Sequence, residues 1–184
     1  MNYLMDKLKN IYDYSDYEIS LIRYALTALF YDFSKLIVFG IYYFYTNRLV
    51  PYLFALLPLI LLRTQNGGIH FKKYWTCFLF TFGYLELCIG ILPELIPLPL
   101  SAMHVILLLC AVVNWFIGPN SLTRNTDINT AFIKKAKLRT LLVIIGLEIL
   151  LAVYPANMYL VVSFWTVVLH TVQIAIVKIT KGSD

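Results

Sequence analysis

The stretch LPLSAMHVILLLCAVVNWFIG, residues 98–118, decides the fold class of this chain. It contains no Asp, Glu, Lys or Arg, and its 21 residues match the roughly 20 with which an apolar helix crosses a bilayer. Residues 157–177 form a second uncharged stretch of the same length. In the whole chain 60% of the 184 residues are hydrophobic, whereas soluble domains are about 45–50% apolar. The sequence therefore predicts an integral membrane protein.

Shorter apolar segments accompany these two. Six follow one another along the chain, at residues 28–46, 49–62, 77–93, 98–118, 139–154 and 157–177. They predict an all-α, polytopic membrane helix bundle in a single domain, residues 1–184. The second segment is the weakest, because it is short and contains Pro51 and Pro58, and proline interrupts helical hydrogen bonding. It either crosses the membrane with a kink or is re-entrant.

The N-terminal residues 1–27 have a different pattern. Apolar residues recur there at helical spacing between Asp, Lys and Tyr, namely Leu4, Leu8, Ile11, Ile19, Ile22 and Leu26. We expect an amphipathic helix, which either lies on the cytoplasmic leaflet or packs on the bundle. The segment lacks the charged start, apolar core and cleavage site of a signal peptide, so we expect the N-terminus to be retained.

Basic residues predict the orientation in the cell membrane, because cytoplasmic loops carry the excess of Lys and Arg. They gather in residues 63–75, in the segment 119–138 with Arg139, and in the C-terminal tail. The connections 94–97 and 155–156 have none, and 47–48 has only Arg48. This alternation predicts a multi-pass protein with both termini and residues 63–77 on the cytoplasmic side.

The break RTQNGGIHFKKYWTC, residues 63–77, combines a histidine with a cysteine. A nucleophilic cysteine needs a base or positive surroundings, and His70, Arg63, Lys72 and Lys73 supply both types of group. On one straight helix, residues seven apart stand about 10 Å apart along the axis, too far for a hydrogen bond. A His70–Cys77 dyad therefore requires a bend between the two residues.

The residues before His70 can build that bend. Gly67 and Gly68 give the backbone freedom, and their amides or the side chains of Gln65 and Asn66 are candidate oxyanion donors. Arg63 either binds a substrate carboxylate, orients this loop or anchors the membrane interface. On spacing alone, a lone His and a lone Cys at a membrane boundary also fit a packing role.

Other polar residues in the apolar segments carry no such pattern. No C-x-x-C or H-x-x-x-H spacing is present, so we expect no metal, no cofactor and no disulfide framework. We expect packing or hydrogen-bonding roles for Cys88, Cys110, His104 and His170. The charged residues Asp32, Lys35, Glu86 and Glu148 are expected to make helix contacts or to form internal polar groups, with Asp32 pairing with Lys35 and Glu86 turned away from Cys77.

The set Arg63, Gly68, His70 and Cys77, placed between two apolar segments, resembles the signature of the accessory gene regulator B family. These proteins are membrane cysteine endopeptidases of quorum-sensing systems. The resemblance covers the whole chain, including the order of apolar segments and the basic segment after the fourth. It departs from the family at Gly118-Pro119, where Ala-Pro is usual.

The resemblance implies a substrate and a mechanism. The substrate is a propeptide of the accessory gene regulator D type with an acidic C-terminal tail. Cys77 is implied as the nucleophile and His70 as the base that together remove this tail, and the product is a thiolactone or lactone ring. The resemblance also implies a homodimer in the lipid bilayer, and no nucleic-acid partner is expected.

We expect residues 119–138 to form a basic cytoplasmic loop. Together with Arg139, this basic segment carries five positive charges against Asp127. These are Arg124, Lys134, Lys135, Lys137 and Arg139. They either attract the acidic tail or fix the orientation and bind anionic lipid heads. Two rival functions remain beside the peptidase, a small peptide exporter and a scaffold associated with a sensor kinase; both leave Cys77 without a chemical role.

Overall fold

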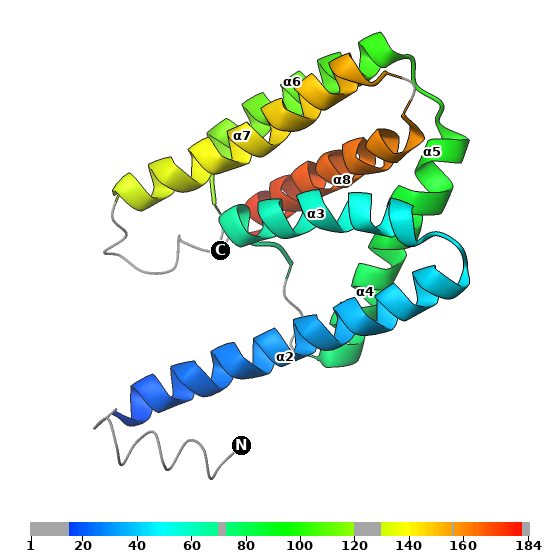
Figure 1. The fold of residues 1–184 in the computed structure, drawn as a ribbon. Coiled ribbons are helices and arrows are strands. Elements are labelled where there is room, and N and C mark those ends of the chain that lie inside the picture. The colour runs from blue at the N-terminus through cyan, green and yellow to red at the C-terminus, as the bar shows by residue number, and fades with distance from the viewer. Residues whose placement is uncertain (1–14, 70–72, 120–129, 156, 182–184) are drawn as a thin grey trace. The chain divides into compact units, whose positions relative to one another are not determined.

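The computed structural model describes residues 15–69, 73–119, 130–155 and 157–181, and every regular element in these ranges is helical, as predicted (Figure 1). The elements are α2 (Asp16–Tyr45), α3 (Leu49–Asn66), α4 (Tyr74–Glu86), the π-helical turn η1 (Leu87–Ile91), α5 (Leu92–Leu95), α6 (Leu100–Ile117), α7 (Thr130–Val153) and α8 (Met158–Lys181). The chain divides into two compact units, Met1–Thr46 and Asn47–Asp184.

The described part of the first unit is the single helix α2. A capping box starts it, in which the Glu18 N–H donates to Ser15 Oγ and the Ser15 N–H donates to Glu18 Oε2. The helix runs without interruption for 30 residues, so the expected boundary at residue 28 is not a break in the backbone. Lys35 Nζ lies 2.8 Å from Asp32 Oδ1, which confirms the predicted pair on one helix face.

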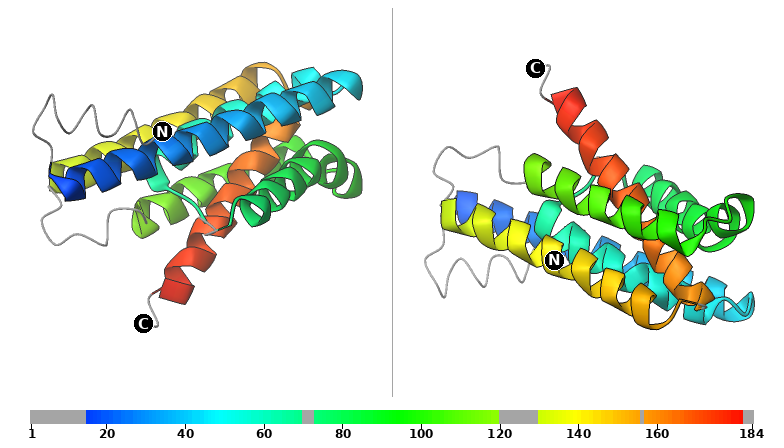
Figure 2. Two further views of the ribbon diagram at one scale, coloured as in Figure 1. Left: turned by 90° about the horizontal axis from the view of Figure 1, so that it is seen from below. Right: turned by 90° about the horizontal axis from the view of Figure 1, so that it is seen from above.

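The second unit is a bundle in which α3, α6, α7 and α8 pack together (Figure 2). α8 contacts α3, α6, α7 and η1, and α7 contacts α3 and α6. The core between these helices is apolar, with Leu62, Leu107, Ile144 and Phe164 almost completely buried. Long-range packing of apolar faces, rather than local propensity, therefore fixes the arrangement of this unit.

Among the described residues, four stretches of helix are long and apolar enough to cross a membrane: Leu49–Asn66, Tyr74–Leu95, Leu100–Ile117 and Met158–Thr180. The expected segments 28–46 and 139–154 fall in α2 and α7, which are not among them. Three charged residues, Lys137, Arg139 and Glu148, lie in the last 18 residues of α7 and make that helix less apolar. The weakest predicted segment is one continuous helix, α3, with Pro58 inside it.

Candidate active site

Cys77 lies in the first turn of α4. The helix begins at Tyr74 after an extended Lys73, and the Cys77 N–H donates to the Lys73 carbonyl at 3.2 Å. The side chain is buried, with 7% of its surface exposed. The thiol is therefore held near the start of α4 and shielded from bulk water.

The helix that carries Cys77 begins at residue 74, as the spacing argument requires, because a dyad needs the histidine outside that helix. His70 and Lys72 lie outside the described residues. The contact between His70 and Cys77 therefore stays a prediction.

The turn that leads towards His70 starts where α3 ends. Gly67 has a φ of 75°, a conformation that favours glycine, and its N–H donates to the Arg63 carbonyl at 2.9 Å. Arg63 Nη2 donates to the Ile69 carbonyl at 3.2 Å. A Cβ atom on Gly68 would lie 3.3 Å from Arg63 Nε and 3.5 Å from Gln173 Nε2. Of the three roles considered for Arg63, this geometry favours orientation of the loop.

The oxyanion candidates differ in their engagement. Asn66 Nδ2 donates to Asn114 Oδ1 and Asn66 Oδ1 accepts from Thr140 Oγ1, both at 3.0 Å, in the buried interior. The carboxamide of Asn66 therefore binds side chains of two other helices. The Gly67 N–H already donates to the Arg63 carbonyl. Among the hydrogen bonds described, Gln65 Nε2 donates only to the hydroxyl of its neighbour Thr64, at 3.2 Å.

The basic segment is a helix over much of its length. The prediction of a loop over residues 119–138 is wrong from Thr130 onward, because α7 begins there. Four of the cations, Lys134, Lys135, Lys137 and Arg139, therefore lie on the first turns of α7, and Arg124 lies outside the described residues. Lys137 Nζ stands 5.8 Å from the centroid of the Trp115 ring, near the end of α6.

The family model described as accessory gene regulator B matches residues 1–174 of the chain. The chain belongs to the accessory gene regulator B family. No curated protein and no solved structure matches it. Members of this family take part in the processing of quorum-sensing peptides and are generally membrane cysteine proteases. The resemblance based on Arg63, Gly68, His70 and Cys77 is thereby confirmed at the level of the family.

Other polar groups of this accessory gene regulator B protein join its helices. His104 Nδ1 lies 2.7 Å from Glu148 Oε1, joining α6 to α7, so the hydrogen-bonding role predicted for both residues is confirmed. Cys88 and Cys110 are buried in the helix packing, as expected. Tyr84 Oη donates to the Thr166 carbonyl at 2.7 Å, a link from α4 to α8 that sequence reasoning missed.

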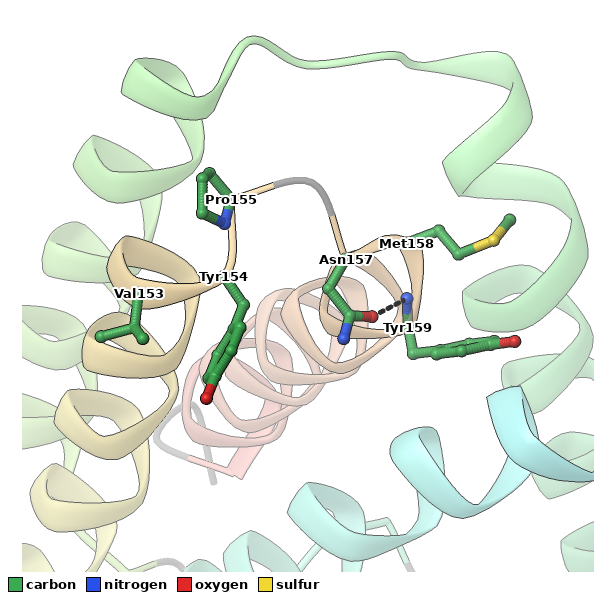
Figure 3. Close-up of a pocket in the computed structure, with 6 residues that line it drawn as sticks. All are labelled: Val153, Tyr154, Pro155, Asn157, Met158 and Tyr159. Carbon is green, nitrogen blue, oxygen red and sulfur yellow. Dashed lines mark hydrogen bonds between the residues drawn. The ribbon is translucent and has the colours of Figure 1, made fainter.

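Two surface pockets of this family member lie away from Cys77. The first, of about 520 Å³, is lined by Val153, Tyr154, Pro155, Asn157, Met158 and Tyr159 at the α7–α8 connection (Figure 3). There the Tyr159 N–H donates to Asn157 Oδ1 at 2.9 Å. The second, of about 460 Å³, is lined by Arg48, Glu86, Gly90, Ile91, Glu94 and Leu95. Neither pocket includes Cys77 or the turn after α3. Glu86 lines the second pocket, which agrees with the prediction that its side chain points away from the thiol.

Within residues 15–69, 73–119, 130–155 and 157–181, no group of three or more His, Cys, Asp or Glu side chains could hold a metal ion. The described residues of the candidate site are the Cys77 thiol, the turn that Arg63 holds and the cations of α7.

Proposed function

We propose that this chain is a membrane cysteine endopeptidase that removes the C-terminal tail of an accessory gene regulator D-type propeptide and promotes cyclisation of the remaining signal segment. The observation that carries the proposal is the placement of Cys77, buried in the first turn of α4 after a turn that Arg63 holds. Membership of the accessory gene regulator B family supports it. An exporter or a scaffold would give this placement no role.

The first step is acyl transfer to the enzyme. His70 accepts the thiol proton, and Cys77 Sγ attacks the carbonyl carbon of the peptide bond between the signal segment and the tail. The negative charge then develops on the carbonyl oxygen, for which the Gly68 amide and the Gln65 side chain are the candidate donors. The C–N bond breaks, His70 returns its proton to the leaving amine, and the tail departs. The signal segment remains as a thioester on Cys77.

The second step releases the product. An internal Cys or Ser of the peptide attacks the thioester carbonyl, loses its proton to His70 and displaces the Cys77 thiolate, which closes a thiolactone or lactone ring. Attack by water would give a linear acid instead. Burial of Cys77 favours the ring, because it limits the access of water while the bound peptide holds its own nucleophile near the ester.

The acidic tail needs a cationic partner. Lys134, Lys135, Lys137 and Arg139 on α7 are proposed to bind it, together with Arg124, Lys72 and the exposed Lys73. The same cations suit anionic lipid heads, so the two roles are compatible. In this proposal the motif and both termini face the cytoplasm, and the enzyme acts as a homodimer in the bilayer.

The decisive experiment is cleavage of the cognate propeptide in membranes by the intact protein and by Cys77→Ala, His70→Ala and Cys110→Ala. Cys110→Ala is the matched control, since it removes another buried thiol. Mass spectrometry separates the released tail, the linear peptide and the ring. We expect the first two variants to release no tail and the control to retain cleavage. Tail release by Cys77→Ala would overturn the proposal and favour an exporter or scaffold.

A further inference from the structure

We propose that Asn66, Asn114, Thr140 and Thr171 form a network that positions the turn leading to the catalytic motif, so that Asn114, Thr140 and Thr171 are positioning residues for the peptidase reaction. This inference rests on the proposed function. We call these four side chains the Asn66 network. They come from four different helices, α3, α6, α7 and α8, and all four are buried in the bundle.

The contacts of the Asn66 network run in an unbroken chain. Thr140 Oγ1 donates to Asn66 Oδ1 at 3.0 Å, and Asn66 Nδ2 donates to Asn114 Oδ1 at 3.0 Å. Asn114 Nδ2 donates both to the Cys110 carbonyl and to Thr171 Oγ1, each at 2.8 Å. Thr171 Oγ1 donates to the Val167 carbonyl at 2.9 Å. Every side chain of the network therefore has a partner in the interior.

The direction of the hydrogen bonds is fixed by the Cys110 carbonyl, which can only accept. Asn114 must therefore turn its Nδ2 towards Cys110 and its Oδ1 towards Asn66. Asn66 must in turn present Nδ2 to Asn114, which leaves its Oδ1 for the hydroxyl of Thr140. Reversing either carboxamide would bring two acceptors together. The network thus specifies one arrangement of the four helices.

The location of Asn66 gives the network its role. Asn66 is the last residue of α3, and Gly67, with its positive φ, follows directly. One turn earlier, Arg63 reaches forward to the Ile69 carbonyl. The network therefore anchors the point from which the Arg63-held turn leaves α3. A displacement of about 1 Å at a reacting centre can lower the rate on the order of 100-fold. By fixing the start of the turn, the Asn66 network therefore affects catalysis.

The same network ties the turn to the proposed tail-binding cations. Thr140 follows Arg139 directly. It lies one helical turn after Ala136, which stands between Lys135 and Lys137. The Thr140–Asn66 bond therefore sets the first turns of α7 against the end of α3. The cations remain on α7 when this bond is lost, and their electrostatic attraction for the tail needs no exact alignment. Loss of the bond should therefore impair the alignment of the scissile bond with Cys77 more than the binding of the tail. It should lower kcat and leave KM nearly unchanged.

Stability alone does not explain these polar side chains. Interhelical hydrogen bonds contribute little net free energy in membranes, because the separated helices also find partners. An apolar set of similar volume would pack in the same space. The network adds a single defined alignment of the four helices, whereas an apolar contact would allow several.

The test compares Thr140→Val with Ser163→Ala in the full-length protein in membranes. Ser163 Oγ donates to the Phe54 carbonyl at 2.7 Å, so the control also loses one interhelical hydrogen bond, between α8 and α3, outside the network. We expect Thr140→Val to lose about 10- to 100-fold in kcat for propeptide cleavage, with KM nearly constant. Thr140→Ser, which keeps the hydroxyl, should restore most of the rate. Ser163→Ala should cleave normally.

A second readout needs no propeptide. The rate of alkylation of Cys77 by iodoacetamide, followed by peptide mapping, reports the surroundings of the thiol directly. It should change in Thr140→Val and stay constant in Ser163→Ala. If Thr140→Val fails to insert, Thr171→Val removes the link to Asn114 from the other side and serves as the replacement.

The outcomes separate this inference from the proposed function. Equal kcat in Thr140→Val and Ser163→Ala, or a change confined to KM, would overturn the positioning role while Cys77 remains the nucleophile. Tail release by Cys77→Ala would instead show that the peptidase mechanism is wrong. A drop in kcat that Thr140→Ser does not reverse would also count against the inference, because the hydroxyl would then be irrelevant.

Discussion

Two of the polar contacts that join helices inside the bundle differ in chemistry. The Asn66 network is neutral and deeply buried, and the hydrogen bonds among its four side chains are complementary. The His104–Glu148 pair consists of two ionisable groups that are about one-quarter exposed, and Glu148 Oε2 has no hydrogen-bond partner within the described residues. Asn114 and His104 stand ten residues apart on α6, about 15 Å along its axis.

The comparison indicates that the place of a polar contact, and not the ionisable character of its groups, should decide whether the contact affects catalysis. The network meets the end of α3, where the turn to the motif begins, whereas the His104–Glu148 pair joins α6 and α7 at a distance from that turn. We therefore expect changes near the end of α3 to alter cleavage, and changes at the pair to alter stability alone. The following variants test this division, from the largest expected effect to the smallest.

Arg63→Ala should give the largest effect among the residues that are not themselves proposed to react. It removes the hydrogen bond to the Ile69 carbonyl and the side chain that lies along Gly68. We expect tail release to fall by about 100-fold or more, because the turn loses its support. Arg63→Lys keeps the charge but not the planar fork, so it should recover only part of the rate.

Arg48→Ala is the matched control for Arg63. Arg48 precedes α3 at the opposite end of the helix and makes no side-chain capping bond there. Steady-state cleavage by Arg48→Ala should equal that of the intact protein. If both arginine variants lost activity equally, the effect would reflect charge or insertion instead of the turn.

Gly67→Ala should rank second. The backbone at Gly67 has a φ of 75° and a ψ of −157°. Residues other than glycine rarely adopt this conformation, and doing so costs them about 1–3 kcal/mol. The turn must therefore shift or the protein must lose that stability. We expect slower cleavage together with a lower midpoint of thermal unfolding in detergent.

Gly146→Ala provides the comparison within α7. A Cβ atom there would meet nothing within 4 Å, and alanine favours a helix over glycine by roughly 0.5–1 kcal/mol. This variant should be at least as stable as the intact protein and should cleave normally. Equal activity in Gly67→Ala and Gly146→Ala would remove the case for a conformational requirement at Gly67.

His104→Leu should affect stability and spare the reaction. It leaves the Glu148 carboxylate without its partner in α6, which costs about 1–3 kcal/mol for a partly buried acceptor. The double change with Glu148→Leu should restore part of that loss. Thermal unfolding measures the first effect and propeptide cleavage the second. Loss of cleavage in the folded double variant would break the division between the two polar contacts.

Much of the fold was readable from the sequence, because apolar length and charge counts are local properties. The uncharged stretches 98–118 and 157–177 became α6 and α8, and the spacing argument placed the Cys77 helix after His70. The prediction of a loop misses the start of α7, because lysines are also typical of cytoplasmic connections. The run TAFIKKAKLR nevertheless contains strong helix formers, which were the available signal.

The Asn66 network was beyond such reading. Asn66 is 48 residues from Asn114 and 74 from Thr140, and no local periodicity says which helix faces meet. One signal was present, since Asn114 is a lone carboxamide in an apolar stretch, and such residues in membranes commonly bond across helices. The sequence could therefore indicate that a partner exists but not which residue it is.

The capping box of α2 completes the comparison as a polar cluster that is fully exposed. The hydrogen bonds from the Ser15 backbone and side chain lower the pKa of Glu18 below its ordinary value. A carboxyl with a lowered pKa in the helix adds stability above its unfolded-state pKa, and this contribution is lost as the pH falls through the folded-state pKa.

The first turn of α2 should therefore fray in acid. Amide hydrogen exchange over residues 16–20, corrected for the intrinsic rate, should then be faster in acid than at neutral pH. Ser15→Ala removes the side-chain hydrogen bond but keeps the backbone one, which lowers the pKa of Glu18 more, so it should weaken that pH dependence without abolishing it. It should leave propeptide cleavage unchanged, because solvent already satisfies exposed groups and the effect ends within one turn. An altered cleavage rate in Ser15→Ala would show that an exposed polar cluster also contributes to the reaction.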